Sequence, residues 1–215
     1  RSNLPYFREI ARRGKPVILS TGMYELDHVR QALQVFSEGG CRELALLHCV
    51  TSYPTPYDQV NLRAMDALRA VFPGPVGYSD HTRGHHVCLA AVACGATILE
   101  KHITLDFDVP NAQDWKVSAG PEDFAAFVRS VREVEAALGD GAKRPAPSET
   151  AALAWALKSL VAARPLLRGS VLAEGMLLAK RPGGGIEPSR LPDVLGRALR
   201  RDLEADEALT WSDLE

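Results

Sequence analysis

Short apolar runs alternate with amphipathic segments over the first 140 residues. Residues 15–22, 43–48, 75–78 and 96–100 are apolar stretches bounded by glycine, proline or polar residues, and they predict buried strands. After each strand, apolar residues recur at helical spacing, or the segment is apolar throughout. This pattern predicts helices over residues 26–36, 62–71, 85–94 and 121–139.

Four strand–helix units in succession predict an α/β fold with a parallel sheet and right-handed crossovers. Such units are the building blocks of a TIM (β/α)8 barrel, in which the loops after the strands converge on one face. Four units cannot close an eight-stranded barrel. We therefore expect the remaining strands either to be absent from this chain or to be supplied by another.

The sequence changes character after residue 140. Residues 141–157 contain prolines and charged residues and are interpreted as a linker. Residues 158–215 contain short β-like pieces at 160–163 and 176–180, glycine breaks, and one helical turn near 191–195. We predict a partial barrel over 1–140 and a small, mostly β domain over 158–215.

Chemically able side chains follow two neighbouring predicted strands. The third strand runs into Gly-Tyr-Ser-Asp-His-Thr at residues 77–82, and the fourth into Glu-Lys-His at residues 100–102. Because parallel strands end on the same side, His81 and His102 are expected to approach each other and could share one metal ion. The alternative is that each is a hydrogen-bonded histidine at a strand end.

Composition narrows the possible partners and compartment. The chain has 215 residues, 46% of them hydrophobic, and a formal net charge of -2, so neither nucleic acid nor an anionic membrane is expected as a partner. No apolar run is long enough to span a bilayer, and the first residues have no signal-peptide core. Cys49, Cys88 and Cys94 lie among apolar residues, which predicts buried thiols in a cytoplasmic protein.

A series of strings, read in order, resembles the sialic acid synthase family, the N-acetylneuraminate synthases and their bacterial relatives. In the barrel part they are residues 15–23, 47–49, 53–56, 60–64, 77–82 and 100–102. Residues 161–164, 180–183 and 210–214 resemble the antifreeze-like (SAF) domain that follows the barrel in that family. The resemblance implies that this chain holds the C-terminal half of the barrel, strands five to eight, followed by the SAF domain.

The resemblance also implies a reaction. Family members condense phosphoenolpyruvate with the open-chain aldehyde of an N-acylated hexosamine, such as N-acetylmannosamine, and release phosphate. The family places a divalent metal, typically Mn²⁺, on the histidines that match His81 and His102. Two imidazoles would leave coordination positions open for substrate oxygen and water.

Hydroxyl groups and carboxylates at matching positions complete the implied site. By resemblance, Ser20, Thr51 and Ser79 contact phosphoenolpyruvate, although Ser20 could simply belong to a turn. By resemblance, Tyr53, Glu100 and Asp114 match positions that face the sugar, although Tyr53 could simply brace its loop. The implied catalytic carboxylates, which can accept hydrogen bonds or assist proton transfer, are Glu100 and Asp114.

Alternatives remain open at several positions. Glu100 could pair with Lys101 or Lys116 instead of meeting the sugar. Residues 111–115 depart from the family's glycine-proline-aspartate-histidine pattern, and Trp115 stands where the family carries histidine. This departure leaves the acyl sugar undefined.

Arg181 resembles the SAF-domain arginine that reaches the partner subunit's active site and contacts the substrate's acyl group. That role would make the protein a domain-swapped homodimer. Without the resemblance, an arginine on a small β module would be read as an ordinary solvated charge.

Two rival hypotheses differ from a sialic-acid-type synthase. One is a related barrel synthase that uses a different aldose, although simpler synthases of that type lack a SAF domain. The other is a non-catalytic carbohydrate-binding or assembly protein that retains half of the barrel.

Overall fold

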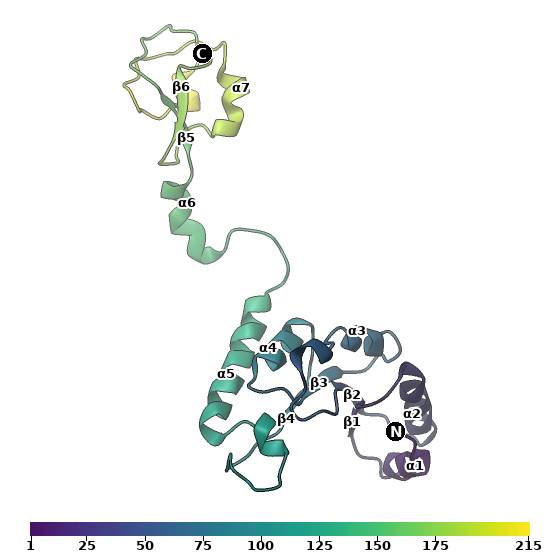
Figure 1. Ribbon diagram of the computed structural model, residues 1–215. Helices are drawn as coiled ribbons and strands as arrows, with labels where there is room; N and C mark the ends of the chain where they lie inside the picture. The colour runs from purple at the N-terminus through teal and green to yellow at the C-terminus, as the bar shows by residue number, and fades with distance from the viewer. The chain divides into compact units, whose positions relative to one another are not determined.

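The computed structural model describes residues 1–215, apart from the side chain of Ala154, and divides into two compact units, Arg1–Gly141 and Ala142–Glu215 (Figure 1). The first unit is α/β and the second is mostly irregular with one small sheet. We describe each unit by itself.

The first unit is built on a four-stranded parallel sheet in the order β1-β2-β3-β4. This order confirms the predicted succession of strands in a half-barrel. The strands are β1 (Val17–Ser20), β2 (Leu44–Cys49), β3 (Val76–Asp80) and β4 (Leu99–Lys101).

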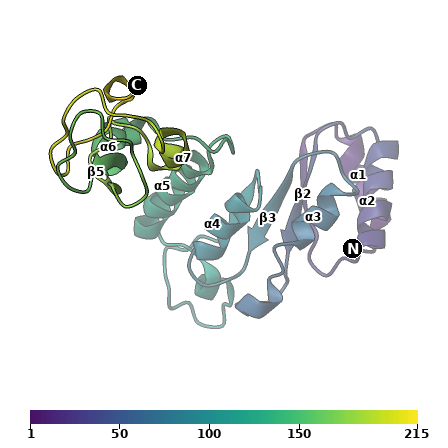
Figure 2. The ribbon, with the colours of Figure 1, turned by 90° about the horizontal axis from the view of Figure 1, so that it is seen from above.

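A helix follows each strand, as predicted, and Figure 2 shows these helices beside the strands. They are α2 (Leu26–Glu38), α3 (Ala64–Arg69), α4 (His86–Ala93) and α5 (Pro121–Leu138). Proline in the first turn and acidic residues near the positive end of the dipole favour the start of α5. Single-turn 3-10 helices occur at Tyr57–Gln59, Asp114–Val117, Pro147–Glu149, Pro188–Arg190 and Trp211–Asp213.

One face of the sheet packs against these helices and forms the core. Leu46 of β2 and Tyr78 of β3 share a buried cluster with Val29 of α2, Met65 of α3 and Cys88 of α4. Because side chains alternate along a strand, the intervening residues of β2, β3 and β4 lie on the opposite face. That opposite face carries the candidate chemistry.

Helix α1 (Leu4–Arg12) was not predicted from the sequence. Its apolar residues Leu4, Phe7, Ile10 and Ala11 recur at helical spacing, and of these only Ala11 is fully buried. Start signals were also present, since the Asn3 side chain accepts a hydrogen bond from the backbone N–H of Tyr6 and a proline occupies the first turn. The ring of Phe7 stacks on Phe36 of α2, with the centroids 5.3 Å apart.

The second unit has a separate core around an antiparallel pair of strands. Strands β5 (Ser159–Ala162) and β6 (Leu177–Lys180) confirm the two predicted β-like pieces, and helix α7 (Leu191–Val194) confirms the predicted turn. Helix α6 (Thr150–Ala156) lies within the stretch interpreted as a linker. The buried residues of this core include Leu160, Leu172, Ile186, Leu199, Leu203 and Leu209.

The four cysteines are free thiols, which agrees with the absence of a disulfide framework. Cys49 and Cys88 are buried as predicted, but the prediction for Cys94 is wrong, because that residue is exposed at the end of α4. The sequence around α4 is apolar on all sides, so it does not show that Cys94, at the end of the helix, faces away from the sheet. Among the residues that the structure describes, no helix combines the length and apolar character needed to cross a bilayer.

Candidate active site

The face of the sheet opposite the helices brings three of the predicted site residues together. The register pairs Ser79 of β3 with Glu100 of β4, and Ser20 ends β1 nearby. The hydroxyl of Ser79 donates a hydrogen bond of 2.6 Å to Glu100 Oε1, and the Ser20 hydroxyl lies 3.4 Å from the same oxygen. Two hydroxyls and one carboxylate therefore converge across three strands.

His81 and His102 follow the last residues of β3 and β4 and lie side by side. Their ring centroids are 5.1 Å apart, and the ring planes are inclined by 59°. His81 is only 5% exposed, whereas the His102 side chain is 31% exposed. The two imidazoles are thus close enough to act on one bound group at the carboxyl ends of the strands.

Hydrogen bonding determines which nitrogen of His81 is available. His81 Nδ1 lies 2.8 Å from the carbonyl oxygen of Val50, and since a carbonyl can only accept, Nδ1 carries the proton. Nε2 then presents its lone pair. Burial lowers the pKa of His81, and the neighbouring His102 lowers it further, against the opposing effect of the Val50 carbonyl. His81 is therefore a neutral imidazole at neutral pH, the form that binds metals.

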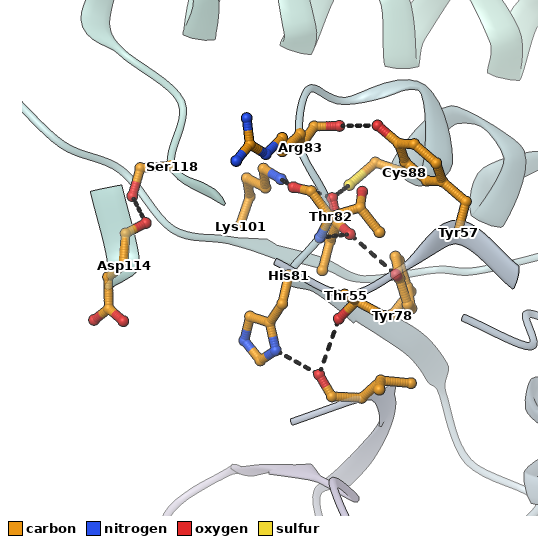
Figure 3. Close-up of polar contacts among 12 residues, drawn as sticks. Thr55, Tyr57, Tyr78, His81, Thr82, Arg83, Cys88, Lys101, Asp114 and Ser118 are labelled. Atoms are coloured by element: carbon orange, nitrogen blue, oxygen red, sulfur yellow. Dashed lines mark hydrogen bonds and ion pairs between the residues drawn. The ribbon is translucent and has the colours of Figure 1, made fainter. Parts of the chain in front are cut away.

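His102 is approached by the carboxylate of Asp114. His102 Nδ1 and Asp114 Oδ2 are 3.7 Å apart, and the Asp114 side chain is 66% exposed. The Ser118 hydroxyl donates to the backbone carbonyl of Asp114 and holds the single helical turn that carries it (Figure 3). The indole N–H of Trp115, the next residue, has no hydrogen-bond partner among the described residues.

The ring of Tyr53 lies against both imidazoles. Its centroid is 4.0 Å from that of His81 and 5.7 Å from that of His102, with the second contact edge-on. Burial, more than any nearby charge, raises the pKa of Tyr53, so its hydroxyl stays protonated. This aromatic wall limits the space around the two rings.

Thr51 approaches the site from the loop after β2. A side chain at Gly22 would meet Thr51 Oγ1 at 2.2 Å, so the absence of a side chain at Gly22 makes room for the threonine. The buried thiol of Cys49 lies 3.8 Å from His81 Nδ1, and burial raises its pKa. Cys49 is thus a neutral neighbour of the site.

The donor set fits a metal held largely by non-protein ligands. Among the described residues, no group of three or more histidine, cysteine, aspartate or glutamate side chains could enclose an ion. His81 Nε2, which has a free lone pair, and the adjacent His102 imidazole are two groups able to bind a divalent metal. Such an arrangement leaves coordination positions for oxygen atoms of a substrate.

Arg181 belongs to the second unit and is engaged there. Its Nε donates a 3.0 Å hydrogen bond to the carbonyl of Ala156, and its guanidinium lies 5.9 Å from the centroid of the Trp155 ring. These contacts tie β6 to the end of α6 within the unit.

One group of residues was missed by the sequence interpretation. Lys101 pairs with buried Asp80, at 2.8 Å, and not with Glu100. The other alternative is also not observed, because Lys116 Nζ lies 3.5 Å from Gln113 Oε1. The alternation of side chains along a strand could have revealed this pair. Asp80 and Lys101 each precede a candidate histidine, so both face the side of the sheet opposite to the histidines.

Comparison with known proteins assigns the family. The NeuB family pattern matches residues 1–143, and the SAF domain pattern matches residues 158–215. An uncharacterized protein of Methanocaldococcus jannaschii is 44% identical over 210 residues, which cover 98% of this chain and 62% of that protein. N,N'-diacetyllegionaminic acid synthase of Campylobacter jejuni subsp. jejuni serotype O:2 is 41% identical over 97% of this chain and 63% of its own length.

A solved structure agrees with these matches. N-acetylneuraminic acid (sialic acid) synthetase from Leptospira borgpetersenii serovar Hardjo-bovis, in complex with citrate, superimposes with a TM-score of 0.63 at 36% identity. The match covers 70% of this chain and 52% of that one. The chain spans about three fifths of the length of the curated relatives that it matches. These findings establish that the chain belongs to the NeuB family and carries a SAF domain over residues 158–215.

Proposed function

We propose that this chain forms part of a synthase that joins phosphoenolpyruvate to an N-acylated hexosamine, giving a sialic-acid-type nonulosonate and phosphate. The observation that carries the proposal is the pair of adjacent imidazoles, His81 and His102. On the same face of the sheet, the hydroxyls of Ser20 and Ser79 meet the carboxylate of Glu100. Family membership supports it, since relatives of this chain are named as synthases of legionaminic and sialic acids.

His81 and His102 would hold the divalent metal, which we take to be Mn²⁺. When bound, the metal would supply a Lewis acid for the sugar aldehyde. The protein's own contribution is to keep His81 neutral and oriented through the Val50 carbonyl, and to wall off one side with the Tyr53 ring.

The hydroxyl-bearing residues suit the anionic substrate. Hydroxyl and backbone N–H groups at strand ends donate to phosphate and carboxylate oxygens. Ser20 and Ser79 both point at Glu100 in the structure, and Thr51 lies against Gly22 on the neighbouring loop. We assign these three residues to phosphoenolpyruvate.

Carboxylates and the tyrosine suit the sugar. Tyr53 lies against both imidazoles, Asp114 approaches His102, and Glu100 lies two residues before His102 on the same face. Glu100 and Asp114 are each able to accept a hydrogen bond from a sugar hydroxyl or to take part in proton transfer, so we assign the catalytic carboxylate roles to them.

Arg181 is assigned to the acyl group of the sugar, in the active site of a partner subunit within a domain-swapped homodimer. To serve there, its guanidinium would have to exchange its contacts with Ala156 and Trp155 for contacts with substrate. Arg181→Ala should then raise KM for the sugar several-fold and leave KM for phosphoenolpyruvate nearly unchanged. Equal effects on both constants in steady-state kinetics would contradict a sugar contact.

The proposed reaction is tested by phosphate release from phosphoenolpyruvate. The intact protein is incubated with Mn²⁺ and a panel of N-acyl hexosamines, and phosphate is measured with and without sugar. We expect release that depends on at least one sugar, and a loss of about 10²-fold or more in Ser79→Ala and Glu100→Gln. Absence of sugar-dependent release across the panel, with the protein folded, would overturn the proposal.

The metal assignment is tested separately by calorimetry. Mn²⁺ should raise the melting temperature of the intact protein, because a ligand that binds only the folded state stabilises it. The effect should vanish in the double variant His81→Ala/His102→Ala and persist in His86→Ala, whose side chain lies on α4. An undiminished effect of Mn²⁺ in the double variant would contradict the site.

A further inference from the structure

We propose that Asp80 and Lys101 are positioning residues for His81 and His102. The proposal rests on the proposed function, in which the two imidazoles bind a metal. Asp80 and Lys101 form a buried ion pair on the helix side of the sheet, and with Thr82 they fix the strand ends from which the two histidines project. We call these three residues the Asp80–Lys101 cluster.

The ion pair is almost fully removed from solvent. Lys101 Nζ lies 2.8 Å from Asp80 Oδ2, and the two side chains are 3% and 0% exposed. Figure 3 shows Lys101 and Cys88 gathered above the end of β3, with the ring of His81 pointing away from them. The cluster therefore lies behind the site and cannot itself meet a substrate.

The Asp80 carboxylate is saturated with donors. Its Oδ1 accepts from the Tyr78 hydroxyl at 3.0 Å and from the backbone N–H of Thr82 at 2.8 Å. Its Oδ2 accepts from Lys101 and lies 3.3 Å from the Cys88 thiol of α4. Burial opposes ionisation of Asp80, but the bonds from Lys101 and Thr82 outweigh it and lower the pKa, so the pair is ionised.

The backbone around His81 is held on both sides. Thr82 donates its N–H to Asp80, and its carbonyl accepts a 2.6 Å hydrogen bond from Lys101 Nζ. The carbonyl of His81 itself accepts from the backbone N–H of Thr55 at 2.8 Å. With Nδ1 bonded to Val50, both the ring and the carbonyl of His81 are held, and Nε2 is left free to bind.

The register explains how one pair serves both histidines. Asp80 and Lys101 are Cα partners across β3 and β4. The following residues, His81 and His102, project to the opposite side, since side chains alternate along a strand. A bond between Asp80 and Lys101 therefore sets the separation of the two strand ends at the point where the imidazoles leave them.

An ion pair is a costly way to fill this space, which indicates a role other than stability. Replacing a buried pair by apolar residues of similar volume is often neutral or stabilising, because both charges must be desolvated. Apolar side chains at residues 80 and 101 could not bond to both the N–H and the carbonyl of Thr82. The charged pair therefore fixes the backbone of Thr82 from both sides, which an apolar pair could not do.

The test compares single and paired substitutions in the intact protein. Lys101→Met leaves Asp80 buried and uncompensated, and such variants can unfold. Asp80→Asn/Lys101→Met removes both charges and is expected to fold. The matched control is Asp66→Asn/Arg69→Met, which removes an ion pair of 2.7 Å from the surface of α3 in the same unit.

Two readouts separate positioning from folding. Mn²⁺ affinity, measured from the electron paramagnetic resonance of free Mn²⁺, should fall 10- to 100-fold in the folded Asp80/Lys101 double variant, as expected when residues that orient ligands are lost. In metal-free protein, the nuclear Overhauser effect between the rings of His81 and His102 should weaken. The control variant should retain both signals.

The outcomes are distinct from those for the proposed function. A folded Asp80/Lys101 double variant with wild-type Mn²⁺ affinity and an unchanged ring-to-ring signal would overturn the positioning role. If wild-type protein binds no Mn²⁺, the metal assignment fails, and the ring-to-ring signal alone decides the proposal. If the double variant does not fold, hydrogen exchange of the Thr82 amide in wild-type protein decides it, because unprotected exchange would contradict the bond to Asp80.

Discussion

Gly77 of β3 lies against the backbone just before β4, and Gly77→Ala is expected to push the two strands apart. A methyl group at this position would stand 2.2 Å from the backbone carbonyl oxygen of Ile98 and 2.7 Å from Leu47 Cδ2. Ordinary contact begins at 3.4 Å, so the carbonyl would have to retreat by about 1.2 Å. A backbone group in a paired strand cannot rotate away as a side chain can.

The expected loss of stability follows from two costs and one gain. Overpacking costs about 1–3 kcal/mol. Separating the strands also weakens the 2.9 Å hydrogen bond from the Tyr78 N–H to Ile98 O, worth about 1 kcal/mol. The smaller entropy of the unfolded alanine chain returns about 0.4–1 kcal/mol. We therefore expect Gly77→Ala to lower the free energy of unfolding by about 1–3.5 kcal/mol, or the melting temperature by about 2–14 °C.

Thermal unfolding followed by circular dichroism measures this loss, and a double-mutant cycle identifies its cause. Leu47→Ala removes the side-chain contact but leaves the Ile98 carbonyl in place. If the carbonyl is the obstacle, the effects of Gly77→Ala and Leu47→Ala should add to within about 0.5 kcal/mol. A melting temperature for Gly77→Ala within about 1 °C of wild type would refute the reasoning.

Two further predictions concern the site loop and the second unit. Gly22→Ala should displace the exposed Thr51 side chain, because its Oγ1 would be 2.2 Å from the new methyl group. We expect KM for phosphoenolpyruvate to rise several-fold in initial-rate kinetics. An unchanged KM would contradict the placement of Thr51. Burial opposes ionisation of Asp213, but hydrogen bonds from Arg201 and Thr210 outweigh this effect and lower the pKa of the carboxyl group. The ionised carboxylate therefore stabilises the fold above about pH 4, and this stability is lost as the pH falls through the lowered pKa. Urea unfolding near pH 6 and pH 3 should show a smaller pH dependence in Asp213→Asn than in wild type, and equal dependence would contradict the assignment.

Strands and helices with a buried face were predictable, because burial imposes a period on the sequence. The apolar runs at β1 to β4 and the long helix α5 were found in this way. Helix α1 was missed although Leu4, Phe7, Ile10 and Ala11 recur at helical spacing and its capping signal could have been read. The exposure of Cys94 was missed because apolar composition does not reveal which side of α4 faces solvent.

The site was predictable as a set of strand-end residues but not as a set of contacts. Adjacent parallel strands that both end in histidine imply proximity, and the structure places the rings of His81 and His102 5.1 Å apart. Which lysine meets which carboxylate depends on register and on the face of the sheet, so the partner of Lys101 could not be assigned from neighbours in sequence. The Val50 carbonyl that orients His81 was also hidden, because every residue carries such a group.

The alternation between Ser79, Asp80 and His81 makes chain length more critical here than residue identity. Deleting or inserting one residue within β3 would rotate the imidazole toward the helices and leave the carboxylate of Asp80 facing the substrate side. A conservative replacement at one of these positions removes one interaction, whereas a frame change exchanges the roles of all three. A change in the number of residues in β3 is therefore expected to disrupt the site more thoroughly than any single side-chain replacement along it.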